Sequence, residues 1–377
     1  MAAHSVSVFG RLFAVAAFCL SLTAAYAALA QSSVNPPANA VQNVAPESND
    51  PQAGAVPGGT LGTKSDADIW RAIRGGVQGT VSIPDKKAGL LVQSAGESWR
   101  DFRNGPLPTY GAWAMGGVLV LLALFFLIRG RIPLQGGPSG VTISRFTTIE
   151  RAGHWLLASS FILLGLTGLN LLYGRQVLIP VIGRDAFAAL AIAGKYAHNY
   201  VGFAFMAGLI MIFAMWVLQN LPNRHDLIWL VKGGGIFANN HPPAKKFNAG
   251  QKILFWLVML TGVSLSLSGL ALLFPFEFHL FGKTFAFVNA IFGTDLPTDL
   301  KAVQEMQLSQ LWHAALALLM VVVVLGHIYI GTIGMEGAFD AMGSGEVDLN
   351  WAKQHHSIWT EETMAHGQAA QNPVPAE

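Results

Sequence analysis

Cysteine and charge are both scarce in this sequence. The chain has 377 residues, a single cysteine (Cys19), and only 12% charged residues. Soluble domains carry about a quarter charged residues, so the low charge points to lipid surroundings. One cysteine excludes a disulfide framework, cysteine-ligated iron–sulfur clusters and cofactor attachment through Cys-x-x-Cys-His within this chain. A net charge of +2, without clusters of Lys and Arg, excludes a nucleic-acid partner.

The first 30 residues predict a secretory signal peptide. Arg11 precedes an apolar run that extends from Leu12 to Leu29, and Ala28-Leu29-Ala30 supplies a cleavage site of the A-x-A type. An uncleaved anchor is the alternative, and both interpretations place the following residues outside the cytoplasm. Residues 31–109 then predict a periplasmic linker, rich in Pro, Asn, Ala and Gly at its start, followed by a small external segment.

Five long apolar runs follow, and each is long enough to cross about 30 Å of hydrocarbon as a helix. The predicted spans are one additional N-terminal helix within 110–131 and four further helices at 152–173, 196–221, 253–274 and 306–335. We therefore predict an all-α integral membrane protein. Its four-helix domain covers 132–340, and a cytoplasmic tail covers 341–377.

Basic residues near the span ends predict the orientation. The segments 129–151 and 222–252 carry four and five Lys or Arg residues, whereas the two loops on the opposite side carry three and two. This bias agrees with the predicted signal peptide. Both indicate a multi-pass protein of the bacterial inner membrane, with a periplasmic mature N-terminus and a cytoplasmic C-terminus.

Four of the 11 histidines lie inside predicted spans, where an ionisable residue is costly and by default indicates function. They are His154, His198, His313 and His327. The 14-residue spacing of His313 and His327 places both on nearly the same helix face, about 21 Å apart along the axis. The predicted orientation then pairs His198 with His313 at the outer depth and His154 with His327 at the inner depth.

Each pair joins two helices at one depth, as two axial ligands on opposite faces of a porphyrin would. The residue four positions after each histidine shares its helix face, and in all four cases it is small: Ala158, Gly202, Ala317 and Gly331. We therefore predict two b-type haems and electron transport across the membrane. A zinc or copper site would gather its ligands at one depth. A histidine-relay transporter, which would usually add membrane Asp or Glu, and a structural role remain as alternatives.

From about residue 145 to residue 359 the chain resembles the gamma subunit of membrane-bound respiratory formate dehydrogenase, its anchoring cytochrome b556 subunit. The resemblance rests on Arg-Phe-Thr-Thr-Ile-Glu-Arg-Ala-Gly-His-Trp (145–155), Lys-Phe-Asn-Ala-Gly-Gln-Lys (246–252), Leu-Trp-His-Ala-Ala (311–315), Gly-His-Ile-Tyr (326–329) and Trp-Ala-Lys-Gln-His-His (351–356). Residues 31–144 and their added span resemble the extended gamma subunits. Cytochrome b subunits of hydrogenases or of a thiosulfate reductase remain alternatives.

The resemblance implies that the four span histidines ligate two haems b, paired as above. It also implies a site for a quinone, either menaquinone or ubiquinone, near the cytoplasmic face at Asn248, Ala249, Gly250 and Gln251. Helix capping is the alternative role for Asn248. The implied partners are a catalytic formate dehydrogenase subunit with molybdenum or tungsten and a periplasmic iron–sulfur subunit. This chain would be a non-catalytic subunit that passes their electrons to the quinone.

Haem propionates need cationic partners. We predict Arg145 and Arg151 for this role at the inner depth and Lys195 at the outer depth. For the two arginines, the alternative is that they only follow the general enrichment of Lys and Arg in cytoplasmic loops.

Overall fold

The structure is a computed structural model that describes residues 96–235 and 241–371. The predicted signal peptide (1–30) and most of the predicted periplasmic segment (31–109) lie outside the described residues. The chain divides into two compact units, each described here by itself. The first comprises Met1–Gly105, Thr167–Asn199 and Phe274–Leu308, and the second comprises Pro106–Leu166, Tyr200–Leu273 and Ser309–Glu377.

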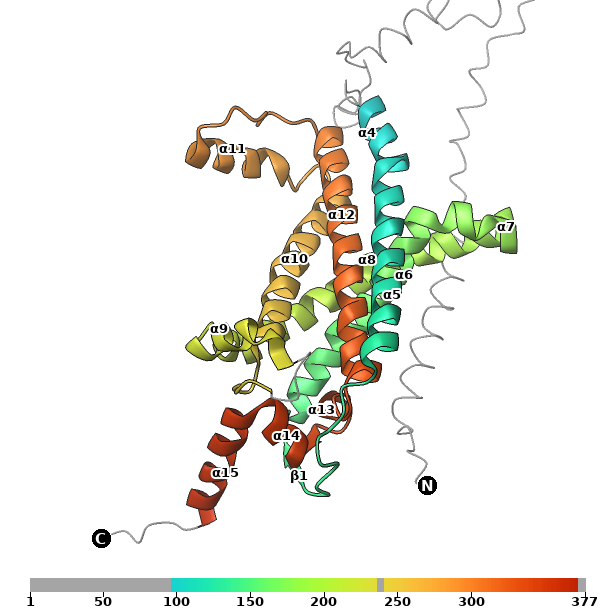
Figure 1. The fold of residues 1–377 in the computed structure, drawn as a ribbon. Coiled ribbons are helices and arrows are strands. Elements are labelled where there is room, and N and C mark those ends of the chain that lie inside the picture. The colour runs from blue at the N-terminus through green and yellow to red at the C-terminus, as the bar shows by residue number, and fades with distance from the viewer. Residues whose placement is uncertain (1–95, 236–240, 372–377) are drawn as a thin grey trace, which may run out of the picture. The chain divides into compact units, whose positions relative to one another are not determined.

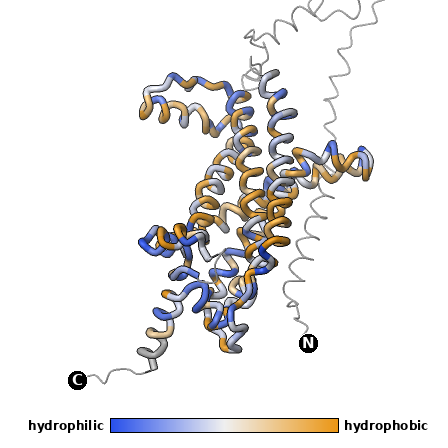
Figure 2. Tube along the Cα trace, in the orientation of Figure 1, coloured by the Kyte–Doolittle hydropathy of each residue, from blue (hydrophilic) through white to orange (hydrophobic). Residues whose placement is uncertain are grey.

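Among the described residues, five helices are long and apolar enough to cross a membrane, which confirms the predicted all-α integral membrane class (Figure 1). The long helices are α5 (Pro106–Arg129), α6 (Thr148–Val177), α8 (Arg184–Trp216), α10 (Ala249–Leu273) and α12 (Ala302–Tyr329). The helix α4 (Gly96–Asn104) precedes α5, and a π-helical turn η4 (Ile330–Gly334) continues α12. Apolar residues dominate the middle of α10 and of α12 (Figure 2).

All five long helices begin earlier than the predicted spans. Two of them, α6 and α12, thereby include a buried carboxylate in their first turn. In the first unit, Glu305 of α12 accepts hydrogen bonds from the backbone N–H groups of Phe281 (2.8 Å) and Gly282 (2.7 Å). These contacts fix the start of α11 (Phe281–Phe292). In the second unit, Glu150 of α6 accepts from the Trp216 indole at 2.9 Å. A carboxylate in a first helical turn is also favoured by the helix dipole.

The remaining elements are short, and the sequence analysis did not predict them. The short helices are α7 (Ile179–Ile182), η2 (Leu218–Asn220), α9 (Arg224–Val231), η3 (Gly233–Gly235), α13 (Asp340–Gly343), α14 (Leu349–His355) and α15 (Ser357–Gln371). Two strands, β1 (Thr142–Ser144) and β2 (Glu346–Asp348), pair antiparallel with Ile143 opposite Val347.

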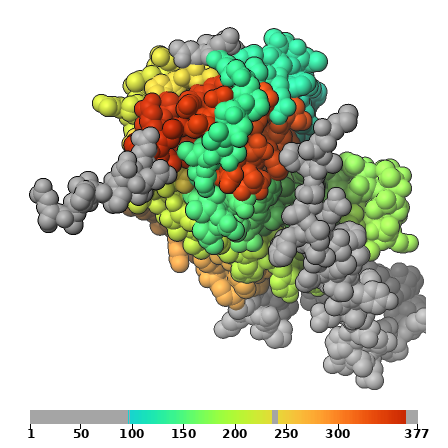
Figure 3. Space-filling model, turned by 90° about the horizontal axis from the view of Figure 1, so that it is seen from below, coloured from blue at the N-terminus to red at the C-terminus, as the bar shows by residue number. Residues whose placement is uncertain are grey.

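Within the second unit, the segments that follow α5 and α12 fold against each other. The N–H of Ile132 donates to the Gly334 carbonyl at 2.8 Å, and β1 and β2 pair further along. Asp348 then accepts from the N–H groups of Ser139 (2.8 Å) and Gly140 (3.1 Å). Figure 3 shows this green segment lying against the red C-terminal segment. We name residues 130–147, 241–247 and 335–365 the end layer.

The end layer has an aromatic core. Its buried aromatic residues are Phe146, Phe247, Trp351 and Trp359, which pack with Val347 of β2 and with Trp216 at the end of α8. Residues 341–371, predicted as a tail, therefore form packed structure over most of their described length. The side of the membrane on which the end layer lies stays a prediction.

Candidate functional site

The second unit brings together the rings of His154 on α6 and His327 on α12. Their centroids are 6.2 Å apart, and the ring planes are inclined by 68°. An imidazole nitrogen binds a transition metal at about 2 Å and lies roughly 1 Å from its own centroid. Two imidazoles on opposite sides of one metal ion therefore have centroids about 6 Å apart. The observed spacing fits two axial ligands of one metal ion.

The surroundings of this pair fit a flat cofactor. His327 is exposed although it lies inside an apolar helix, and a Cβ atom added at Gly326 or Gly331 would meet nothing within 4 Å. The Nδ1 atom of His154 is buried and makes no hydrogen bond to any described residue. In the described part of the chain, no group of three or more His, Cys, Asp or Glu residues could hold a metal ion. Two histidines beside open space suit a porphyrin, because the macrocycle supplies the other ligands.

His198 is held within the first unit by a neighbouring stretch of α6. Its Nδ1 atom lies 2.8 Å from the Thr167 hydroxyl. A Cβ atom added at Gly168 would touch the His198 Cε1 atom at 3.5 Å, so the ring lies against the glycine backbone. With Nδ1 beside the hydroxyl, a metal would be bound through Nε2.

His313 is held in the same way within the second unit. Its Nδ1 atom lies 2.9 Å from the Ser268 hydroxyl on α10, and a Cβ atom at Gly269 would touch Cε1 at 3.4 Å. Sequence analysis missed both hydroxyl groups. The shared signal was present in the sequence, since a Thr-Gly and a Ser-Gly pair each lie inside a predicted span. The pairing of His198 with His313 joins the two units and stays a prediction.

The predicted quinone-binding segment forms the start of α10. The side-chain oxygen of Asn248 accepts from the N–H of Gln251 at 3.0 Å, and the side-chain oxygen of Gln251 accepts from the N–H of Asn248 at 3.0 Å. This reciprocal capping satisfies two backbone donors at the helix start. The alternative role of Asn248 as a helix cap is therefore realised. The side-chain NH₂ groups of both residues make no hydrogen bond to a residue that the structure describes, so they can still donate to a ligand.

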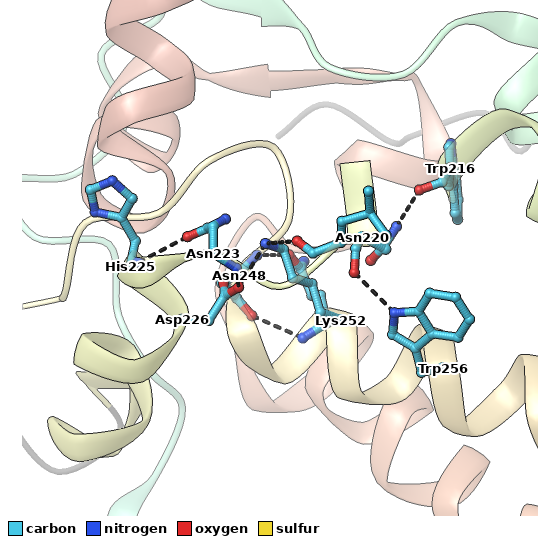
Figure 4. Close-up of polar contacts among 10 residues, drawn as sticks. Trp216, Asn220, Asn223, His225, Asp226, Asn248, Lys252 and Trp256 are labelled. Atoms are coloured by element: carbon cyan, nitrogen blue, oxygen red, sulfur yellow. Dashed lines mark hydrogen bonds and ion pairs between the residues drawn. The ribbon is translucent and has the colours of Figure 1, made fainter. Parts of the chain in front are cut away.

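Neighbouring polar contacts hold this helix start in place (Figure 4). The Lys252 ammonium donates to the Leu221 carbonyl and to Asp226, both at 2.9 Å. Asp226 lies in the first turn of α9, so the buried lysine ties α9 to α10. On the same side, Trp229 of α9 packs against Gly250, where an added Cβ would approach the indole to 2.9 Å. Ala249, the other predicted residue, is buried.

The three predicted propionate partners have different surroundings. Arg145 is buried, and its Nη2 atom donates to the Lys246 carbonyl at 2.6 Å and to His356 Nε2 at 3.0 Å. The Nη1 atom of Arg151 donates to the Gly343 carbonyl at 2.8 Å. Lys195 is exposed on α8. Arg145 thus lies within the end layer, and Arg151 donates a hydrogen bond to it. The role as a propionate partner stays a prediction for all three residues.

The end layer also surrounds Arg145 with aromatic rings, an arrangement that the sequence analysis did not predict. The guanidinium of Arg145 lies 5.0–5.4 Å from the ring centroids of Phe146, Trp351 and Trp359, a cation–π arrangement. Burial lowers the pKa of Arg145 to about 9, although Glu150 opposes the change. Trp351 belongs to the Trp-Ala-Lys-Gln-His-His run, and Trp359 follows it. No local sequence pattern indicated that these two side chains pack against Arg145.

The histidines of that run are buried as well. The rings of His355 and His241 have centroids 4.4 Å apart. Burial, together with the charges of His241 and Arg145, lowers the pKa of His355 to about 3. Burial and Arg145 also lower the pKa of His356 well below its usual value, despite the hydrogen bond to the Lys245 carbonyl. His355 and His356 are thus neutral within the folded layer at pH 7.

Comparison with known proteins identifies the family of the chain. The family model described as prokaryotic cytochrome b561 matches residues 145–345, a range that contains all four span histidines. The chain is 29% identical over 223 residues to the formate dehydrogenase cytochrome b556(fdo) subunit of Escherichia coli K12, covering 59% of this chain and 93% of the relative. It is 28% identical over 224 residues to the nitrate-inducible formate dehydrogenase cytochrome b556(Fdn) subunit of the same organism, covering 58% and 91%.

A third relative, the formate dehydrogenase cytochrome b556 subunit of Haemophilus influenzae, is 25% identical over 231 residues, covering 59% of this chain and 84% of the relative. The family model alone spans more than half of the 377 residues. The chain therefore belongs to the prokaryotic cytochrome b561 family and is a haem b protein of the membrane, in agreement with the five long apolar helices among its described residues.

Proposed function

We propose that this chain is the membrane-anchoring cytochrome b subunit of a formate dehydrogenase. The facing rings of His154 and His327, 6.2 Å apart, carry the proposal that the chain conducts electrons. The formate dehydrogenase assignment is supported by the names of relatives that match 84–93% of their own length. The proposed partners are a catalytic subunit with molybdenum or tungsten and a periplasmic iron–sulfur subunit.

In this proposal the chain binds two haems b. His154 and His327 hold one at the inner depth, and His198 and His313 hold the other at the outer depth. Haem b, when bound, supplies a one-electron carrier at each depth. The protein contributes the ligands, the spacing of about 21 Å along α12, and an apolar environment that excludes water. The orientation predicted from the basic residues places the donor subunit outside and the quinone inside.

The start of α10 is the proposed quinone site. Capping of α10 uses the side-chain oxygens of Asn248 and Gln251, so their NH₂ groups are the donors that a quinone carbonyl requires. Trp229 and Lys252 fix this turn from the side of α9. The quinone is menaquinone or ubiquinone, and its protons come from the cytoplasm.

Single substitutions of the four histidines test the haem assignment. A pyridine–haemochrome spectrum of the purified complex should show about two haems b per copy of this chain. His154→Ala and His327→Ala should remove the same haem from the redox spectrum, and His198→Ala and His313→Ala should remove the other. Loss of one common haem from His154→Ala and His313→Ala would refute the pairing, and absence of haem would refute the proposal as a whole.

The electron donor requires a separate experiment. The complex should be purified through a tag on this chain, and its subunits identified by mass spectrometry. Formate should reduce both haems in that complex. Reduction by hydrogen but not by formate would replace formate dehydrogenase with a hydrogenase.

A further inference from the structure

The two histidines predicted at the outer depth share an environment that the inner pair lacks. Thr167 presents its hydroxyl to His198 Nδ1 at 2.8 Å, and Ser268 presents its hydroxyl to His313 Nδ1 at 2.9 Å. In each case the next residue is glycine, and the imidazole Cε1 lies against it. By contrast, the buried Nδ1 of His154 has no hydrogen-bond partner among the described residues.

The direction of these hydrogen bonds follows from the donors available. The Ser268 hydroxyl has one proton, for which the Ser264 carbonyl at 2.8 Å and the Leu265 carbonyl at 3.1 Å are acceptors within its own helix, and an imidazole that binds a metal through Nε2 carries its own proton on Nδ1. The oxygen of Ser268 is therefore the acceptor for His313, whose proton resides on Nδ1. A helical threonine commonly donates to the carbonyl one turn earlier in the same manner, so Thr167 offers an acceptor to His198.

We propose that Thr167 and Ser268 are positioning residues that accept the Nδ1–H of His198 and His313 and thereby direct Nε2 of each ring to one haem. This inference rests on the proposed outer haem and adds two residues that no comparison assigns. A hydroxyl that accepts from Nδ1–H fixes both the tautomer and the orientation of the imidazole. The Ser268 hydroxyl is held by its own helix, so the orientation of the His313 ring is set before the cofactor binds.

The same hydrogen bonds affect the electronic properties of the ligand. An imidazole whose N–H is hydrogen-bonded is a more basic ligand, and a more basic ligand favours ferric over ferrous iron. Second-shell hydrogen bonding is one of the means by which a protein sets a haem potential. Thr167 and Ser268 therefore lower the potential of the outer haem, which favours electron flow toward the inner one.

Thr167→Val and Ser268→Ala remove the two acceptors with little change in volume. In a potentiometric titration of the purified complex, each should raise the midpoint potential of the same haem and leave the other haem unchanged. A tenfold loss of preference for ferric iron corresponds to about 59 mV for a one-electron couple. The electron paramagnetic resonance signal of the same oxidised haem should also shift, since the ring is free to rotate.

Three further variants separate this role from general packing. Thr167→Ser keeps the hydroxyl and should retain the wild-type potential and signal. Ser266→Ala and Ser160→Ala remove hydroxyls of α10 and α6 that donate only within their own helices, at 2.8 Å and 2.7 Å, and should shift neither haem. If Thr167→Val loses the haem, its retention in Thr167→Ser would still support the proposal.

Unchanged potentials in both Thr167→Val and Ser268→Ala, with two haems bound, would overturn the proposal. Equal shifts in Thr167→Val and Thr167→Ser would also overturn it, because the hydroxyl would then be irrelevant. If the proposed function itself is wrong, the wild-type complex will contain no haem, and this result differs from an unchanged haem potential. Shifts of two different haems would support the role of both hydroxyls and refute the pairing of His198 with His313.

Discussion

Acidification should open the end layer before it affects the membrane helices. His356 is 1% exposed and His355 is 6% exposed. The Nδ1–H of His356 donates to the Lys245 carbonyl at 2.8 Å, and its Nε2 accepts from Arg145 at 3.0 Å. Protonation would remove that acceptor and place two cations in contact. The folded layer therefore keeps both rings neutral, as the lowered pKa values of His355 and His356 indicate.

The dependence of stability on pH follows from proton uptake by the open state. An unfolded histidine has a pKa of about 6.5, so below that pH the open layer binds protons that the closed layer does not. Stability is therefore complete above about pH 6.5 and falls as the pH decreases, by up to about 1.4 kcal/mol per pH unit for each histidine. Between pH 7.5 and 5.5 the two rings together should reduce the closing free energy by about 3 kcal/mol. For His355 the loss continues toward its pKa of about 3.

Hydrogen–deuterium exchange, corrected for the intrinsic pH dependence of amide exchange, measures this opening. Peptides that cover 349–360 should lose protection between pH 7.5 and 5.5, whereas peptides from the middle of α10 should not. His356→Gln remains neutral and should remove about half of the dependence, while His225→Gln on α9 should leave it unchanged. Equal protection of 349–360 at both pH values, or an unaltered dependence in His356→Gln, would refute this reasoning.

Three further predictions concern individual contacts. Glu150 and Lys246 form a partly buried ion pair at 2.6 Å with side chains 11% and 19% exposed, so Glu150→Gln or Lys246→Met alone should destabilise the complex by about 1.5–3 kcal/mol. The double variant should lose less than the sum in thermal unfolding, and additive losses would argue against coupling. Asn248→Asp keeps the capping oxygen but removes the NH₂ donor, so it should abolish quinol formation while the haems stay reducible. Asn248→Ala should do the same and also lose about 1 kcal/mol of helix stability, whereas normal turnover in both would move the quinone site elsewhere. Arg151→Gln should shift the potential of the inner haem if Arg151 pairs with a propionate, and a potential within error of wild type would discard that role.

Apolar runs of membrane-spanning length were sufficient to predict the long helices, since the described residues form five such helices at those runs. The rings of His154 and His327 lie 6.2 Å apart, whereas their role as ligands, their depths and the orientation of the chain stay predictions. Apolar runs can be recognised because the sequence displays them locally. Helix ends were less accurate, because Glu150 and Glu305 are compatible with a helix start but not with a hydrocarbon interior.

Contacts between distant segments were beyond this kind of reasoning. The hydrogen bond between Arg145 and His356 joins residues 211 positions apart, and no periodic pattern relates them. Thr167 and Ser268 escaped notice for a different reason. Serine and threonine in membrane helices usually bond to their own backbone, so composition alone does not reveal which of them also orient a neighbouring side chain.

The pairing of the segment after α5 with the segment after α12 has a consequence for biogenesis. The Asp348 carboxylate that binds the N–H of Ser139 is 209 residues further along the chain. At a synthesis rate of about 5–20 residues per second, the early segment waits roughly 10–40 s for its partner. During that interval β1 has no strand to pair with, and Arg145 lacks the rings of Trp351 and Trp359 that later contact it. The end layer can therefore close only after the last membrane helix has been synthesised.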